Sequence, residues 1–275
     1  MKLMPQDSIW STGSRRNAVL ELLLEQEKVT VRDLVDRFDV SAMTVHRDLD
    51  ALEARGVLRK VRGGATMQPT AVYEGSLAFR LGEQRDAKEA IARQAARRVT
   101  PGSSVVLDDS TTALAMVPQL ALIAQLTLVT NFVSIVEELS QSTDNSVTLI
   151  AIGGAYNHKY HAFGGVLAER ALADLRVDLC FVSVAAIDIP RAGTFHQEAD
   201  QAVIKRAMTE IADESVLLAD ASKFSKRALH RVVDIGRFDA AIVDEETGAD
   251  DIAGLRSGGV AVEVASRSVL GDDGS

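Results

Sequence analysis

The stretch VSAMTVHRDLDALEARGVLRKVRGGA, residues 40–65, decides how the first part of this chain folds. Ser41 can cap a helix in which Val45, Leu49 and Leu52 recur at the i, i+4 and i+7 spacing that places side chains on one helical face. The arginine-rich segment behind this helix, with its GGA turn, is typical of a strand and a glycine turn. The stretch therefore predicts a helix followed by the start of a β-wing.

Two more helices are predicted upstream, and Gly56 is a plausible end for the third. Ser14 can cap the first helix, and Thr30 can open the second because Asp33 follows three residues later, an approximate capping box. Short helices joined through the FDVS turn, the last one carrying exposed polar residues, form a helix-turn-helix. We therefore predict a winged helix-turn-helix DNA-binding domain over residues 11–66.

The side of the third helix that faces away from the core carries the candidate DNA contacts. A recognition helix places its N-terminal residues against base edges in the major groove. Arg47 can hydrogen-bond guanine or a phosphate, and Ser41 and Thr44 suit phosphates near the helix start. Basic residues of the wing could hold the neighbouring backbone. The predicted DNA-binding residues are Thr30, Ser41, Met43, Thr44, His46, Arg47, Arg59, Lys60 and Arg62.

The charge of the chain has to be considered by segment, because the net value of -9 looks wrong for a DNA-binding protein. Residues 11–66 contain ten Lys and Arg and nine Asp and Glu. Residues 67–275 contain nineteen Lys and Arg and twenty-nine Asp and Glu. The acidity therefore belongs to the second segment. This asymmetry permits a local contact with nucleic acid and argues against a protein that coats DNA.

Several classes are excluded by composition. No window holds the ~18 consecutive apolar residues of a membrane helix, and the first ten residues are too short and polar for a secretory signal. The single cysteine, Cys180, lies in the apolar run VDLCFVSV, which favours a buried inert thiol and a reducing compartment. We therefore expect a cytoplasmic protein with no membrane association.

The remainder of the chain has the pattern of a parallel α/β domain. Residues 67–82 mix Pro, Gly and polar residues and are predicted to be a linker, followed by a helix over about 83–99. Apolar runs then alternate with helical stretches: SSVVLD, LTLVTN, SVTLIAIGG, VDLCFVSVAAID, SVLLAD, AAIVDE and GVAVEVA. Such runs indicate a mostly parallel sheet covered on both faces. We expect this larger domain over residues 83–265.

Ligands of such sheets bind at the carboxyl ends of the strands. Ser110, Thr111 and Thr112 would present hydroxyl and N–H groups to an anion, and Lys223 supplies a positive charge. Amide and carboxylate side chains nearby could bind sugar hydroxyls. The candidate effector-binding residues are Asp109, Ser110, Thr111, Thr112, Asn131, Gly153, Gly154, Asp188, Glu198 and Lys223. A phosphorylated sugar is the ligand that this set suits best.

The N-terminal segment resembles the winged helix of the DeoR family of bacterial transcription regulators. The family pattern, VS-x-x-T-[IV]-x-R-D-L followed by Leu-x-x-x-Gly and an R-x-x-GGA wing, is matched at thirteen positions: Val40, Ser41, Thr44, Val45, Arg47, Asp48, Leu49, Leu52, Gly56, Arg62, Gly63, Gly64 and Ala65. The chain departs from the pattern at His46, where the family usually has a second arginine. That departure affects which operator sequence the helix would recognise.

The resemblance continues over residues 75–265, in VVLDDSTT, LVTN, IAIGG, VDLCFVSVAAID, EADQAVIKRAM and LLADASKF. The family's sensor domains resemble ribose-5-phosphate isomerase, which implies the same fold and a sugar-phosphate effector here. Ser110 stands where the family has glycine. The resemblance further implies a repressor of carbohydrate metabolism that binds operator DNA as a homo-oligomer, a dimer or a tetramer.

A sugar-phosphate isomerase with an accessory helical domain is the alternative, using paired carboxylates and Lys223 for proton abstraction. The isomerase's lysine and glycine motif is missing, and a DNA-reading module has no use in that catalysis. Neither GxxxxGK[ST] nor GxGxxG occurs, and HKYH at 158–161 is a poor metal pattern, so no cofactor or metal is expected. The effector's identity, the target genes and the direction of the response are left open.

Overall fold

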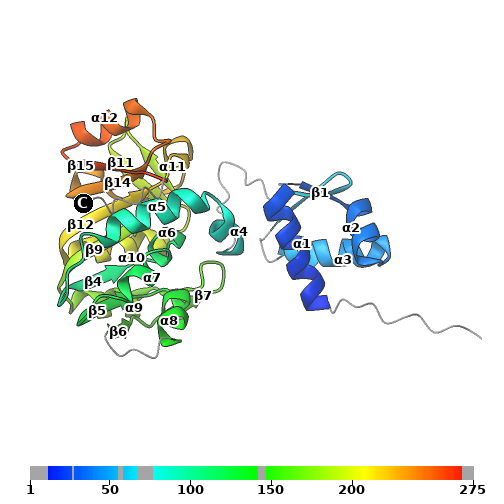
Figure 1. Cartoon of the computed structure of the whole chain (residues 1–275), viewed down its shortest axis with the longest axis horizontal. Helices are drawn as coiled ribbons and strands as arrows, with labels where there is room; N and C mark the ends of the chain where they lie inside the picture. Colours follow the sequence, from blue (N-terminus) through cyan, green and yellow to red (C-terminus); the bar gives the residue numbers. More distant parts are fainter. Residues whose placement is uncertain (1–11, 27, 55–57, 67–76, 142–146, 268–275) are drawn as a thin grey trace, which may run out of the picture. The chain divides into compact units, whose positions relative to one another are not determined.

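The computed structural model describes residues 12–26, 28–54, 58–66, 77–141 and 147–267 (Figure 1). The chain divides into two compact units between Glu83 and Gln84.

The first unit has helices packed on a three-stranded antiparallel sheet of order β1-β3-β2. Its elements are α1 (Thr12–Gln26), β1 (Lys28–Thr30), α2 (Val31–Phe38), α3 (Ala42–Ala54), β2 (Arg59–Val61), β3 (Gly64–Thr66) and α4 (Leu77–Gly82). Leu34, Leu49 and Leu52 are fully buried in its core. The predicted winged helix-turn-helix is confirmed, and β1 is an additional strand that pairs with the wing.

Helix capping explains where these helices begin. Oγ1 of Thr30 accepts a hydrogen bond from the backbone N of Asp33 at 3.1 Å, so Thr30 caps α2 as predicted. Oγ of Ser41 accepts from the N of Thr44 at 3.2 Å at the start of α3. The prediction that Ser14 caps the first helix is wrong, because α1 already begins at Thr12. Positions 11, 12 and 14 each hold Ser or Thr, and either residue type can cap a helix. Residue type alone therefore does not show which position begins the helix. Gly56, the predicted end of the third helix, lies outside the described residues.

The predicted linker is a helix in its last part. Residues 77–82 form α4, which groups with the first unit and packs against α1. A helix this short is stabilised by packing and not by propensity, so composition could not show it. Residues 67–76 of the predicted linker lie outside the described residues. The predicted helix over 83–99 is present as α5 (Arg85–Ala96).

The second unit is built on a parallel sheet, as predicted, and its strand order is β15-β14-β12-β9-β4-β5-β6. Each apolar run of the sequence forms one of its strands: β4 (Ser104–Leu107), β5 (Leu126–Thr130), β6 (Val147–Ala151), β9 (Val177–Ser183), β12 (Ala212–Ala219), β14 (Ala240–Asp244) and β15 (Ala261–Ala265). The run VDLCFVSVAAID is divided, because its last residues form β10 (Ala186–Asp188) in a separate antiparallel sheet with β11 (Gly193–His196) and β13 (His230–Asp234).

The helices of this unit lie along the sheet, and a short hairpin of β7 (Ala155–Asn157) and β8 (Ala162–Gly164) accompanies them (Figure 1). Besides α5 they are α6 (Thr111–Leu114), α7 (Val117–Leu120), α8 (Val133–Ser140), α9 (Val166–Ala173), α10 (Ala199–Glu210), α11 (Ser222–Ser225), the 3₁₀ turn η1 (Ile235–Arg237) and α12 (Ala249–Ser257). α5 packs on β12, β14 and β15, and α10 packs on β9 and β12.

The direction of winding reverses at β4. From β4 the chain proceeds outward through β5 and β6, and it then returns to the other side of β4 with β9 and proceeds through β12, β14 and β15. Right-handed crossovers in two directions place helices on both faces of the sheet and open a crevice where the direction changes. The carboxyl ends of β4 and β9 are therefore the expected location of a ligand site.

Candidate effector site and nucleic-acid interface

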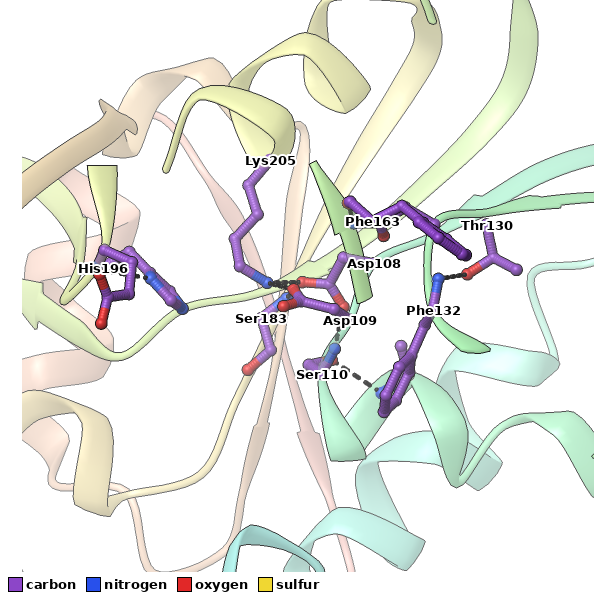
Figure 2. A network of polar contacts seen from close by, with 12 residues as sticks. Asp108, Asp109, Ser110, Thr130, Phe132, Phe163, Ser183, His196 and Lys205 are labelled. Carbon is purple, nitrogen blue, oxygen red and sulfur yellow. Dashed lines mark hydrogen bonds and ion pairs between the residues drawn. The ribbon is translucent and has the colours of Figure 1, made fainter. Parts of the chain in front are cut away.

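A buried charged cluster occupies the point where the sheet changes direction. Nζ of Lys205, on α10, lies 2.6 Å from Oδ2 of Asp108 and 2.6 Å from Oδ1 of Asp109, two residues that follow β4 (Figure 2). Oδ2 of Asp108 also accepts from the backbone N of Ser183 at 2.8 Å, and its Oδ1 accepts from the N of Ser110 at 3.0 Å. Asp108 thus joins the ends of β4 and β9, and α10 is attached to both.

The electrostatics of this cluster keep its buried lysine charged. The Lys205, Asp108 and Asp109 side chains are 3%, 1% and 2% exposed. Burial by itself lowers the pKa of Lys205, but the charges of the two aspartates and their hydrogen bonds outweigh it and hold that pKa above its ordinary value. The formal charges of the three groups sum to one negative charge. Such a cluster suits the hydroxyl groups of a ligand better than an anion.

The loop after Asp109 is tightly held. Ser110 caps α6, because its Oγ accepts from the N of Ala113 at 3.0 Å. Its φ is -86°, an ordinary value for a residue with a side chain, so serine is accommodated where the family has glycine. Thr111 and Thr112 are buried beside it. In this loop the Ser110 hydroxyl is already engaged by its own helix.

Asn131 follows the neighbouring strand β5, and Gly153 and Gly154 follow β6. Nδ2 of Asn131 donates to the carbonyl of Phe163 at 2.7 Å, while its Oδ1 is buried without a hydrogen-bond partner among the described residues. Gly153 is exposed with open space around it. A Cβ at Gly154 would lie 2.5 Å from the carbonyl oxygen of Gly164, so the close approach that this glycine permits is to β8.

Asp188 and Glu198 are engaged in ion pairs within the fold. Asp188 lies 2.6 Å from Nη1 of Arg191 in its own turn, and this hydrogen bond lowers the pKa of Asp188. Glu198 lies 3.1 Å from Nζ of Lys159. The structure therefore brings Asp109, Ser110, Thr111 and Thr112 together around Asp108, and it gives Asp188 and Glu198 protein partners.

Lysines gather at the end of β12. Nζ of Lys223 lies 3.8 Å from Oδ2 of the buried Asp220. Burial raises the pKa of Asp220, but the positive charges of Lys223, Lys88 and Lys226, with a hydrogen bond from Ser222, bring it below its usual value. The positive charges of these lysines favour an anionic group at this corner.

Sequence reasoning missed Lys205 and Lys88 as members of this region. Lys205 lies between Ala202 and Met208 at i-3 and i+3, both buried on α10. A lysine on the apolar side of a helix signals a buried partner of opposite charge, since an isolated buried charge is too costly. That signal was present in EADQAVIKRAM. The partner could not be identified, because Asp108 is 97 residues away.

The candidate nucleic-acid interface lies on α3 and the wing. Met43, His46 and Arg47 are exposed on α3, with Nη2 of Arg47 3.7 Å from Sδ of Met43. Arg59 and Arg62 are exposed on the wing. These five side chains are exposed to solvent, as a contact with DNA requires.

The four other candidates, Thr30, Ser41, Thr44 and Lys60, have partners inside the unit. The hydroxyls of Thr30 and Ser41 cap their helices, and Ser41 also bonds to the hydroxyl of Thr44 at 3.0 Å. The ammonium group of Lys60 pairs with Asp50 of α3, so this lysine attaches the wing to the helix.

An ion-pair cluster not foreseen from the sequence orients α3. Asp48 is buried, with its Oδ2 2.5 Å from Nε of Arg15 and its Oδ1 2.9 Å from Nε of Arg16. Both arginines belong to α1. The cluster attaches the buried side of α3 to α1 and so fixes the orientation of the helix that carries Arg47 and His46.

A winged helix-turn-helix followed by an α/β domain with polar groups at its switch point defines a DNA-binding regulator with a sensor domain. The model of the DeoR-like helix-turn-helix domain matches residues 15–70, and that of the DeoR C terminal sensor domain matches residues 83–245. The chain belongs to the DeoR family, and it is a transcription regulator and not an enzyme.

Curated relatives match along nearly their whole length. The transcriptional repressor AccR of Agrobacterium fabrum is 33% identical over 82% of this chain and 88% of its own. A protein of Escherichia coli O157:H7 whose name proposes it as the aga operon transcriptional repressor is 32% identical over 92% and 94%. The glycerol-3-phosphate regulon repressor of Escherichia coli K12 is 28% identical over 84% and 90%.

Among solved structures, ribose 5-phosphate isomerase A from Methanocaldococcus jannaschii is similar at a TM-score of 0.37 and 15% identity, over 52% of this chain and 55% of that chain. The assignment to the DeoR family does not depend on this similarity. Within the part of the chain that the structure describes, no group of three or more His, Cys, Asp or Glu could hold a metal ion. None of the described helices is long and apolar enough to span a membrane.

Proposed function

We propose that this regulator represses a carbohydrate operon in the cytoplasm and that a phosphorylated sugar, bound at the carboxyl ends of β4, β9 and β12, controls its DNA binding. We assign the effector site to a sensor domain over residues 83–265 and the DNA site to a DNA-binding domain over residues 11–66. The names of the relatives support the class of target genes, since they include regulators of the aga operon and the glycerol-3-phosphate regulon.

The observation that carries the proposal is the separation of charge along the sheet edge. Asp108 and Asp109 with Lys205 sum to one negative formal charge, whereas Asp220 lies beside Lys223 and its pKa is lowered also by the charges of Lys88 and Lys226. β4 and β12 are separated by β9 alone, so the ends of these two strands are about 10 Å apart, two strand spacings. A molecule with hydroxyls at one end and a phosphate at the other matches this arrangement.

The phosphate therefore belongs at Lys223 and its neighbours, and the sugar belongs at Asp109 and Asn131. This assignment differs from the sequence expectation in one respect. Ser110 caps α6 with its hydroxyl, so the loop from Ser110 to Thr112 supports the sugar end and not the phosphate.

The DNA unit acts as a symmetric pair on a palindromic operator, with Arg47 against base edges and Arg59 and Arg62 against the backbone. Thermal unfolding of the full chain with phosphorylated sugars, and with the same sugars lacking phosphate, tests the effector assignment. Equal shifts from both forms, or none from any phosphate, would contradict it. Fluorescence anisotropy with DNA selected from the native genome then shows whether the stabilising compound weakens DNA binding, as repression relieved by an inducer requires.

A further inference from the structure

One buried side chain beside the charged cluster makes no hydrogen bond with the described residues. Gln201 lies on α10 one turn before Lys205, so the two residues share a helical face. Gln201 is 1% exposed, and neither Oε1 nor Nε2 has a hydrogen-bond partner among the residues that the structure describes. A buried primary amide without partners is rare and unfavourable, so this one requires an explanation.

A second unsatisfied amide lies along the same hairpin. A Cβ at Gly164 would lie 3.8 Å from Nε2 of Gln201, which places this amide against β8. The preceding residue, Phe163, accepts from Nδ2 of Asn131 at 2.7 Å, and Oδ1 of Asn131 is also buried without a partner in the described chain. Two amides, from α10 and from the end of β5, thus approach the same strand; both atoms of the Gln201 amide and the oxygen of Asn131 have no hydrogen-bond partner among the described residues.

Packing does not account for glutamine at this position. Methionine has a similar length and shape and would fill the same space without a desolvation cost. The surroundings also limit what could bind, because the neighbouring cluster of Asp108, Asp109 and Lys205 is negative overall. The missing partner must offer both donors and acceptors without adding negative charge. Hydroxyl groups meet both conditions.

We propose that Gln201, together with Asn131, binds the hydroxyl groups of the effector and determines which sugar the sensor accepts. The inference rests on the proposed function and extends it by naming the residues that discriminate among sugars. A site that hydrogen-bonds a hydroxyl rejects analogues lacking it, because the buried polar atoms are then left unpaired.

The test is Gln201→Met in the full chain. The variant should melt at the temperature of the unmodified chain or above it, since a costly amide is removed. Its affinity for the phosphorylated sugar that most stabilises the unmodified chain, taken from a panel of glucose, galactose, fructose and ribose phosphates, should fall about tenfold. Its preference between glucose 6-phosphate and galactose 6-phosphate should diminish. Binding of inorganic phosphate, which depends on the lysines near Asp220, should be unchanged.

Gln94→Met is the matched control. Nε2 of Gln94 donates to Oε2 of Glu263 at 2.6 Å, so this glutamine has a partner inside the protein. The control should lower the melting temperature and leave sugar-phosphate affinity unchanged.

The outcomes separate the two hypotheses. If Gln201→Met binds the sugar phosphates as tightly and as selectively as the unmodified chain, an ordered water satisfies the amide and the inference is overturned, while the proposed function stands. A loss of inorganic phosphate binding in parallel with the sugar phosphates would show a general structural defect and would also overturn it. If the unmodified chain responds to no phosphorylated sugar, the proposed function fails and the inference fails with it.

Discussion

Asp108 and Lys205, 97 residues apart in the sequence, form a buried ion pair with 2.6 Å between Oδ2 and Nζ. Replacing Lys205 by Met leaves Asp108 and Asp109 buried without their counter-ion. We expect a loss of about 3–5 kcal/mol in the free energy of unfolding, measured by urea denaturation. Arg176→Met is the control, because its pair with Asp213 is exposed and such pairs contribute roughly 0–1 kcal/mol. Equal small losses in both variants would contradict the structural role of Lys205.

The same pair predicts how stability depends on pH. The folded-state pKa of Lys205 is raised above the ordinary value of 10.5 by the two aspartates. The folded state therefore retains a proton that the unfolded state releases, so this contribution is complete below pH 10.5 and is lost as pH rises above it. The difference in unfolding free energy between the unmodified chain and Lys205→Met should be constant from neutral to mildly alkaline pH and should shrink above that value. A difference that changes between pH 6 and 9 would show that another group is responsible.

Arg47 is the side chain of α3 best placed to contact bases. It is exposed and lies in the first half of the helix, and among the described residues its guanidinium contacts Met43. Arg47→Ala should cost about 1–3 kcal/mol of specific binding, measured by anisotropy against the selected DNA and a scrambled sequence. Arg85→Ala, which removes an exposed arginine of the sensor unit, should leave affinity unchanged. An unaltered specific affinity in Arg47→Ala would refute the assignment of α3 as recognition helix.

Arg62 lies exposed at the tip of the wing, next to Gly63 with its φ of 80°. A contact with a phosphate does not depend on base sequence, so Arg62→Ala should weaken binding to specific and scrambled DNA alike. The slope of log affinity against log salt should decrease by about 0.9, one phosphate contact. Titrations at several salt concentrations measure both quantities. A loss confined to the specific sequence would indicate a base contact for the wing.

Lys223 tests the phosphate end of the effector site. At 100 times its dissociation constant, a ligand stabilises the folded state by about 2.7 kcal/mol, which a thermal-shift measurement detects. Lys223→Ala should remove most of the shift caused by a phosphorylated sugar, because the ammonium group supplies part of the positive corner around Asp220. Arg170→Ala, an exposed position of α9, is the control. A full shift in Lys223→Ala would place the phosphate elsewhere.

Much of the fold could be predicted because its signals are local. Continuous apolar runs such as those around Val106 and Ile242 indicate buried strands whichever strands lie next to them, and Thr30 caps a helix through a residue three positions away. The recognition helix was predictable for the same reason, since the spacing of Val45, Leu49 and Leu52 by itself defines the buried and exposed sides.

Which residues make up the candidate effector site is decided by the tertiary structure. The order of the strands brings the end of β4 beside the end of β9, and only then does Asp108 meet Ser183 and Lys205. No local pattern encodes contacts across 75 or 97 residues. The sequence by itself determined which segments are helices and strands and that polar residues follow the strands. The tertiary structure decided which of these residues face one another, because a buried charge or amide is defined by its neighbours in space.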